Sequence, residues 1–379
     1  MKILHIIIGL DVGGAELMLN RLIESHQGNI NYSHSVISLT LFGKVGEQLK
    51  EIDIEVRALG MRSPLHIPRV LWQLMRVIRA ECPDIVQTWM YHADLLGGLA
   101  ARLAGNRNVI WGVRTTEVSA GSLSAIVAVR KACALLSWWL PHSIVCAAEA
   151  SRIAHVALGY DAAQMVVIPN GFDLAGLVAT SDQRTVLREK CGFGVDDVVI
   201  GSLGRFNPDK DQESFVRAAG RLAQQNTQVR FLLVGRDLDA GNLELARWLA
   251  KTGHANRFVL LGERADVSIC LAAMDIFCLS SRTEGFPNVV GEAMAMGLPC
   301  VVTDVGDAAM LVADAGVVVP KENSVALAQG LSRVLTMTPD ARQRLGQQAK
   351  ARIQAEFTME RARERFEALY ERIIENGGC

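Results

Sequence analysis

Short apolar runs alternate with longer amphipathic stretches along most of this chain of 379 residues. The runs have the length and the branched aliphatic content of buried strands, and the stretches between them have the spacing of helices. This alternation is typical of βαβ units that build a parallel sheet. The expected strands of the first part are Lys2–Ile8, His34–Leu39, Ile54–Ala58, Asp84–Thr88, Asn108–Val113, Ser143–Cys146 and Met165–Ile168.

A turn-rich stretch, Pro169–Asp173, interrupts this pattern, which then restarts. The chain is long for a single core, so we predict two consecutive α/β domains, residues 1–170 and 171–355, followed by a charged helical tail over 356–379. The expected strands of the second domain are Val198–Leu203, Arg230–Val234, Val259–Leu261, Asp275–Leu279, Pro299–Thr303 and Gly316–Val319.

The overall composition indicates a folded enzyme without nucleic acid as a partner. Half of the residues are hydrophobic, 21% are charged and the formal net charge is −1, so no general positive field attracts a polyanion. The eight cysteines show no C-x-x-C pair and no zinc spacing, which is typical of reduced thiols in a cytoplasmic protein. We expect Lys2–Ile8 to be a first strand rather than a signal peptide.

One apolar segment, Leu123–Leu140, leaves two interpretations open. Arg130 and Lys131 interrupt it, so it is a poor membrane span. It is either a helix of the core or an amphipathic surface element that touches a membrane. A peripheral location at the inner face of a membrane therefore stays open beside a purely cytoplasmic one.

Two glutamates, Glu284 and Glu292, flank the start of an expected helix. Glu284 follows the strand Asp275–Leu279 in a loop, and Glu292 lies in the first turns of the helix after it. Ligands of open α/β sheets bind beyond the carboxyl ends of strands, and a helix N-terminus suits a phosphate. Since the acids would repel the phosphate itself, we interpret them as acceptors for hydroxyl groups on either side of it, as in a nucleotide sugar.

Two cations follow the strand Val198–Leu203. Arg205 and Lys210 lie in the loop that leads to the next helix, and together they are suited to the charge of a departing diphosphate. The alternative is a solvated loop in which Lys210 pairs with Asp209 or Asp211.

The first domain contains further candidates. Adjacent Gly13 and Gly14 form either a tight turn or a loop that lets a ligand approach the backbone, with Glu16 as an acid of the first helical turn. His92, just past the strand Asp84–Thr88, either touches a substrate or forms a structural hydrogen bond. Arg114 either binds an acceptor or a phosphate, or pairs with Glu117.

The sequence suggests neither a metal nor a cofactor. No zinc-protease or calcium-loop motif is present, and the spacing of Asp237 and Asp239 has no supporting feature around it. We therefore expect Arg205 and Lys210, rather than a metal ion, to carry the charge of the leaving group.

In their order and spacing, several motifs together resemble the retaining glycosyltransferases of family 4. They are Gly13–Glu16, Val167–Asp173, Gly204 and Arg205 with Lys210, Leu233–Gly235, Glu284–Glu292, and Glu292–Pro299. The resemblance implies the α/β GT-B architecture, with two Rossmann-like domains facing across a cleft and a C-terminal helix that crosses back to the first domain. It also implies that the donor binds mainly to the second domain and the acceptor to the first.

The resemblance implies roles position by position. Arg205 and Lys210 would bind the donor diphosphate, Glu284 the transferred sugar, and Glu292 the ribose. The other implied donor contacts are the backbone at Phe286, Pro287 and Asn288, the glycines Gly13 and Gly14 facing the diphosphate, and Arg264 near the base. His92 would lie near the reacting sugar.

The implied activity is transfer of a sugar from a nucleoside diphosphate donor, by default a UDP-sugar, to a glycan or lipid-linked glycan in surface polysaccharide synthesis. Two alternatives remain. A nucleotide-sugar epimerase of the same fold would bind a similar donor and need no acceptor. A non-catalytic carbohydrate-binding protein would have little reason to hold both cations and both acids.

Overall fold

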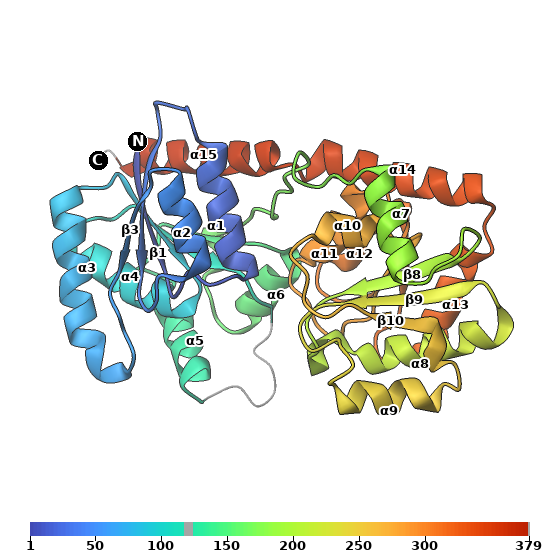
Figure 1. Ribbon diagram of the computed structural model, residues 1–379. Coiled ribbons are helices and arrows are strands. Elements are labelled where there is room, and N and C mark those ends of the chain that lie inside the picture. The colour runs from blue at the N-terminus through green and yellow to red at the C-terminus, as the bar shows by residue number, and fades with distance from the viewer. Residues whose placement is uncertain (117–123, 378–379) are drawn as a thin grey trace. The chain divides into compact units, whose positions relative to one another are not determined.

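The computed structural model describes residues 1–116 and 124–377, and the chain divides into two compact units (Figure 1). The first unit comprises Met1–Gly171 and Met359–Cys379, and the second comprises Phe172–Thr358. Each unit is built around a parallel sheet with helices in its crossovers, which confirms the predicted fold class.

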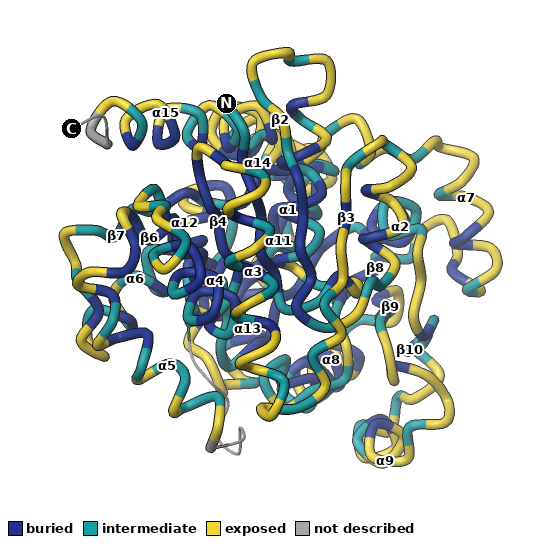
Figure 2. The backbone as a smooth tube through the Cα atoms, turned by 90° about the vertical axis from the view of Figure 1, so that its left-hand side faces the viewer, coloured by how far each residue is buried: buried dark blue, intermediate teal, exposed yellow. Residues whose placement is uncertain are grey.

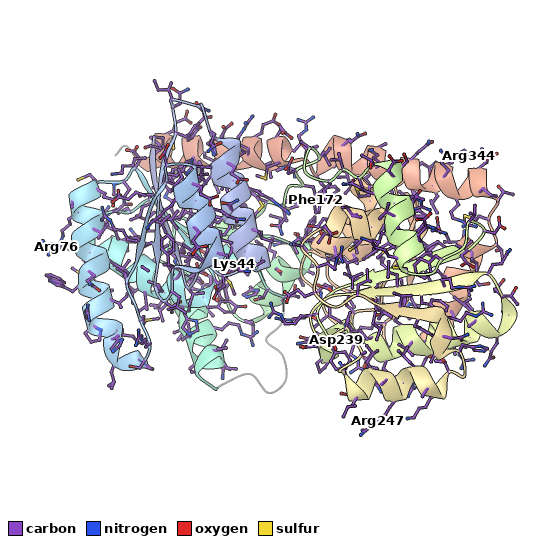
Figure 3. All side chains as sticks on the ribbon, in the orientation of Figure 1. Lys44, Arg76, Phe172, Asp239, Arg247 and Arg344 are labelled. Atoms are coloured by element: carbon purple, nitrogen blue, oxygen red, sulfur yellow. The ribbon has the colours of Figure 1, made fainter. Side chains whose placement is uncertain are left out.

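The sheet of the first unit has the order β3-β2-β1-β4-β5-β6-β7. The strand ends agree with the predictions to within a residue or two, because branched aliphatic runs between turn signals leave little freedom in register. The strands are β1 (Lys2–Ile7), β2 (Ser33–Ser38), β3 (Glu55–Ala58), β4 (Ile85–Trp89), β5 (Val109–Val113), β6 (Ser143–Cys146) and β7 (Met165–Val167). β4 and β6 are buried along their whole length, as their dark blue colour in Figure 2 shows.

Helices cover both faces of this sheet. Along β1, Leu4 and Ile6 enter one core while Ile3 and Ile7 enter the other, as the two-residue period of a strand requires. One face packs on α3 (Ile67–Glu81), α4 (Tyr91–Ala104) and α5 (Ser124–Leu136), and the other on α1 (Gly14–Ser25), α2 (Gly43–Glu51) and α15 (Met359–Gly377). A further helix, α6 (Glu149–Ala157), joins β6 to β7.

The C-terminal helix α15 belongs to the first unit although it follows the second in sequence. Its residues Phe366 and Tyr370 are fully buried beside α1. The Tyr370 hydroxyl donates a hydrogen bond of 2.5 Å to Gln87 Oε1 on β4, and Arg363 donates one of 2.7 Å to the carbonyl of Ser25. Apolar burial and specific hydrogen bonds therefore attach the tail to this sheet.

The second unit repeats the architecture with the order β10-β9-β8-β11-β12-β13. The strands are β8 (Val198–Leu203), β9 (Val229–Val234), β10 (Phe258–Leu260), β11 (Ile276–Leu279), β12 (Cys300–Thr303) and β13 (Gly316–Val319). The helices are α7 (Ser181–Lys190), α8 (Gln212–Gln225), α9 (Leu243–Lys251), α10 (Val267–Ala272), α11 (Asn288–Ala295), α12 (Ala308–Val312), α13 (Ser324–Leu335) and α14 (Pro339–Glu356).

The strand order reverses once in each sheet. In the first unit β1 lies between β2 and β4, and in the second β8 lies between β9 and β11. Crossovers leave these neighbouring strands in opposite directions, which opens a crevice at their carboxyl ends where ligands of such sheets bind. Gly13 and His92 follow the strands of the first reversal point, and Arg205 and Glu284 follow those of the second.

Candidate active site

The loop after β8 presents two cations differently. Arg205 is exposed, and its guanidinium forms no hydrogen bond or ion pair with any described residue. Lys210 ends the short 3₁₀ turn Pro208–Lys210, and its aliphatic chain passes over Gly204. Gly204 has a φ of 153°, a conformation that side chains disfavour. The loop therefore holds Lys210 in place and leaves Arg205 available to an anion.

Lys210 forms an ion pair with Glu284, from the loop after β11. Its Nζ lies 2.6 Å from Glu284 Oε1, and the side chains are 25% and 11% exposed. The alternative pairing with Asp211 does not occur, since Asp211 is buried, bonds Arg282 at 3.1 Å and caps α8. The structure thus brings together two of the predicted residues that are 74 positions apart.

The segment after Glu284 is held by close packing. The Phe286 ring is buried and stacks on Phe172 at 6.1 Å. A Cβ at Gly291 would lie 2.0 Å from the Phe172 ring, and one at Gly306 would lie 2.3 Å from the carbonyl oxygen of Gly285. Small residues are therefore required where α11 and the neighbouring loop approach this segment.

The helix α11 begins directly beyond this segment. Asn288 is its first residue, Pro287 precedes it, and no side chain caps its N-terminus within the described residues. The positive end of the helix dipole therefore lies at this segment, where it favours an anion. Glu292 is half-buried on the second turn of the same helix.

In the first unit, the predicted glycine turn leads into α1. Gly13 is its N-cap and Gly14 its first residue, with Glu16 in the first turn as expected. A Cβ at Gly13 would lie 2.5 Å from Glu16 Oε2, so the carboxylate folds over the glycine backbone. Burial raises the pKa of Glu16, and the nearby Asp11 raises it further. A hydrogen bond from the backbone N–H of Glu16 acts in the opposite direction.

His92 lies in the first turn of α4, beyond β4. Its imidazole is half-buried, forms no hydrogen bond with the described residues, and has a pKa lowered by burial. Met90, the N-cap, has a φ of 72°, a strained value for a side chain of this size. Among the described residues, the imidazole therefore lacks the structural hydrogen bond that was the alternative interpretation.

Arg114 follows β5, and its guanidinium is buried without a carboxylate partner among the residues that the structure describes. It donates a hydrogen bond of 3.0 Å to Asn170 and lies 4.4 Å from the centre of the Trp89 ring, while Nε and Nη2 lack a partner among the described residues. Burial lowers its pKa to about 10, so it stays protonated at neutral pH. Glu117, the partner considered from sequence, lies outside the described residues.

Arg264 lies in a different environment from Lys210 and Glu284. It pairs with Asp266 at 2.5 Å and lines a cavity of about 270 Å³ with α7 residues such as Val186 and Leu187. The bond to Asp266 raises the pKa of Arg264 and lowers that of Asp266. The structure does not bring Arg264 into contact with the Lys210–Glu284 pair.

The described residues contain no cluster of three or more His, Cys, Asp or Glu side chains arranged to hold a metal ion. Within the same residues, no helix is both long and apolar enough to span a bilayer. The helix α5, inside the segment with two interpretations, buries Cys133 and Ala134 and exposes Leu135. Leu123, the first residue of that segment, lies outside the described residues.

Sequence patterns did not single out Ser281. Its hydroxyl donates a hydrogen bond of 2.6 Å to the same Glu284 oxygen that Lys210 contacts. Thr303, on β12, donates one of 2.8 Å to the carbonyl of Ser281. The only available signal was the position of Ser281 between a buried strand and Glu284, which is common to many loop serines.

Two α/β units, each with a parallel sheet and with candidate functional residues at its reversal point, define the GT-B class of fold. HepE of Anabaena, solved in complex with UDP, superposes with a TM-score of 0.84 at 24% identity over 98% of this chain and 100% of that one. A glycosyltransferase of Rickettsia africae ESF-5 gives 0.82 at 18% identity over 99% of both chains.

Two family models cover most of the sequence. The model of Glycosyltransferase Family 4 matches residues 12–175, and that of Glycosyl transferases group 1 matches residues 197–337. The chain therefore belongs to the family 4 glycosyltransferases.

Curated relatives share less than a third of their residues with this chain. The UDP-Gal:alpha-D-GlcNAc-diphosphoundecaprenol alpha-1,3-galactosyltransferase of Escherichia coli is 29% identical over 238 residues, which are 62% of this chain and only 61% of that protein. The capsular polysaccharide biosynthesis glycosyltransferase CapM of Staphylococcus aureus is 23% identical over 341 residues, 86% of this chain and 87% of that protein.

Proposed function

We propose that this protein is a retaining glycosyltransferase that moves a sugar from a UDP-sugar to a hydroxyl of a glycan or lipid-linked glycan. The observation that carries the proposal is the Lys210–Glu284 pair, 2.6 Å apart at the reversal point of the second sheet, with an exposed Arg205 in the same loop as Lys210 that has no ion-pair partner among the described residues. It supports a site where cations receive a diphosphate and a carboxylate receives a sugar hydroxyl.

The donor half of the reaction falls to the second unit. Arg205 and Lys210 stabilise the charge of the departing diphosphate, helped by the uncapped N-terminus of α11. Glu284 accepts a hydrogen bond from the transferred sugar and Glu292 one from the ribose. The backbone of Phe286, Pro287 and Asn288 belongs to the same donor-binding segment as these two acids. Arg264 has the least support as a donor contact because it does not contact the Lys210–Glu284 pair.

The acceptor half falls to the first unit. The imidazole of His92 has no hydrogen-bond partner among the described residues, which supports a contact with the reacting sugar or acceptor. Gly13 and Gly14 let a phosphate approach the backbone once the Glu16 carboxylate, which folds over Gly13, moves aside. Two donors of Arg114 have no partner in the described part of the chain, which supports either a phosphate contact or a role in positioning Asn170. Glu16 has the weakest case, since its carboxylate folds back on its own turn.

The default of a UDP-sugar and a glycan acceptor agrees with the names of relatives. The Escherichia coli relative is named for a UDP-galactose donor and a lipid diphosphate acceptor, and the Staphylococcus aureus relative for capsular polysaccharide. We also propose that the reaction needs no metal, since Arg205 and Lys210 supply positive charge. Full activity in EDTA is the expected result, and a requirement for Mg²⁺ or Mn²⁺ would contradict this part.

We further propose that the protein works at the cytoplasmic face of a membrane. Leu135, Trp138 and Trp139 are 77%, 63% and 53% exposed at and just beyond the end of α5, and indole rings favour the bilayer interface. Co-sedimentation with phosphatidylglycerol vesicles should weaken severalfold in Trp138→Ala/Trp139→Ala. Absence of wild-type binding at low salt would refute the contact.

The test of the proposed function is a donor screen. Thermal stabilisation by UDP-, GDP-, ADP- and dTDP-sugars selects the donor, and ligand at about 100 times its Kd should add about 2.7 kcal/mol. Release of the nucleoside diphosphate should then require an added acceptor, and the product should keep the anomeric configuration of the donor. Acceptor-independent conversion of the sugar would indicate an epimerase, and no stabilisation by any donor would refute the proposal.

A further inference from the structure

The carboxylate of Glu284 is bound through one oxygen only. Oε1 accepts hydrogen bonds from Lys210 Nζ and from the hydroxyl of Ser281, both at 2.6 Å. Oε2 accepts none from the described part of the chain, and it is not among the buried atoms that lack a partner. The two oxygens of one carboxylate are therefore in different environments, one held by protein and one open to a ligand.

Ser281 is itself held rigidly. Its side chain is almost completely buried, and the hydroxyl of Thr303 donates to its carbonyl at 2.8 Å. Its neighbours hold the loop after β8, because Ser280 Oγ donates to the carbonyl of Lys210 at 2.9 Å and the Arg282 N–H donates to the carbonyl of Asp209 at 2.8 Å. The short segment Ser280–Arg282 therefore sets the position of both members of the ion pair.

We infer that Ser281 is a positioning residue that, together with Lys210, turns Glu284 Oε2 toward a single hydroxyl of the transferred sugar. This inference rests on the proposed function. The terminal torsion of a glutamate is broad, so one contact leaves the carboxylate free to rotate. A second, buried donor on the same oxygen restricts that rotation and gives the free oxygen a defined direction.

This arrangement has a consequence for donor choice. A site that offers a fixed acceptor to a hydroxyl penalises a donor that lacks it, because the acceptor is then left unpaired. Without the Ser281 hydroxyl the ion pair remains, yet the carboxylate can turn to water or to another hydroxyl. The catalytic rate and the discrimination between donor sugars should therefore fall together. Affinity for the nucleotide should change little, because the proposed contact with its ribose is made by Glu292 and not by Glu284.

The experiment compares wild type, Ser281→Ala and the control Ser332→Ala, a serine on α13 away from the site. Each is assayed with the donor selected by the screen and with the deoxy analogues of its sugar, and UDP affinity is measured by calorimetry. We expect Ser281→Ala to lose roughly tenfold in kcat, within the range for a misplaced contact. Its UDP affinity should stay within about twofold, and the penalty for one deoxy analogue should shrink about threefold or more, since that penalty reflects one oriented hydrogen bond.

Three results would overturn the inference in distinguishable ways. Wild-type kcat and wild-type analogue ratios in Ser281→Ala would show that Ser281 does not orient Glu284. A lower kcat with unchanged ratios would show a structural role only. Absence of turnover by the wild type with every nucleotide sugar would refute the proposed function, and the inference with it.

Discussion

The ion pair between Lys210 and Glu284 should contribute to stability as well as to catalysis, and its contribution follows from its burial. Exposed pairs contribute ~0.2–1 kcal/mol, whereas removing one partner of a buried pair costs ~3–5 kcal/mol. With side chains 25% and 11% exposed, this pair lies between these limits. Because Ser281 still donates to Glu284 when the lysine is gone, we expect Lys210→Met to cost ~1–2 kcal/mol.

A double-mutant cycle with Glu284→Gln isolates the pair. The amide is nearly isosteric and keeps an oxygen for Ser281, so the double variant should recover ~1 kcal/mol relative to additive single effects. Since two units need not unfold together, the assay is hydrogen exchange of peptides covering β8 and β11, which reports local opening of the second unit.

The matched control is Lys251→Met, an exposed lysine of α9 with no ion pair among the described residues. It should change the free energy of opening by less than ~0.5 kcal/mol, as surface substitutions usually do. The reasoning is refuted if Lys210→Met behaves like this control, or if the two single effects at Lys210 and Glu284 simply add.

Two further predictions concern packing and pH. Gly291→Ala places a Cβ 2.0 Å from the Phe172 ring, so it should destabilise the second unit by ~1–3 kcal/mol. Adding Phe172→Leu to the same chain should recover part of this loss. Full wild-type stability in Gly291→Ala would contradict the packing. Burial, reinforced by a neighbouring histidine, lowers the pKa of His34 to about 3. Because the folded state then binds fewer protons than the unfolded state below pH 6.5, stability falls as pH decreases from about 6.5 toward 3. The contribution of His34 to this pH dependence is at most ~1.4 kcal/mol per pH unit. Burial raises the pKa of Asp94 to about 7, which gives a contribution of the opposite sign. The test is therefore that His34→Gln flattens the fall in the urea midpoint between pH 7 and pH 5, and an unchanged slope would contradict the prediction.

The sequence predicted the sheets closely because their signal is local. Most strands are largely buried runs such as Val198–Leu203, whereas the edge strand β3 is mostly exposed, and the strand ends coincide with glycine or polar turns. The candidates Arg205 and Glu284 could also be predicted from the sequence, since both lie in loops that follow such strands. The strand order, which places these two loops next to each other, appears only in the structure.

Features that depend on contacts distant in sequence could not be predicted. Whether Lys210 pairs with Glu284 or with the adjacent Asp211 depends on Arg282, which binds Asp211 from another loop. The two Arg114 donors that lack a partner within residues 1–116 and 124–377 have no sequence signature, and neither do the hydrogen bonds of Ser281. A buried arginine and a loop serine look the same in sequence whatever surrounds them.

The charge of the leaving group provides the most direct test of the account. Arg205 is exposed and unpaired among the described residues, so Arg205→Ala should leave thermal stability unchanged while kcat with the selected donor falls roughly 10²–10³-fold, as expected for loss of one charge stabiliser. The control is Arg217→Ala, an arginine on α8 that is 66% exposed and pairs with Glu213, which should keep kcat within about twofold. Near wild-type kcat in Arg205→Ala would contradict the assignment of the diphosphate to this loop.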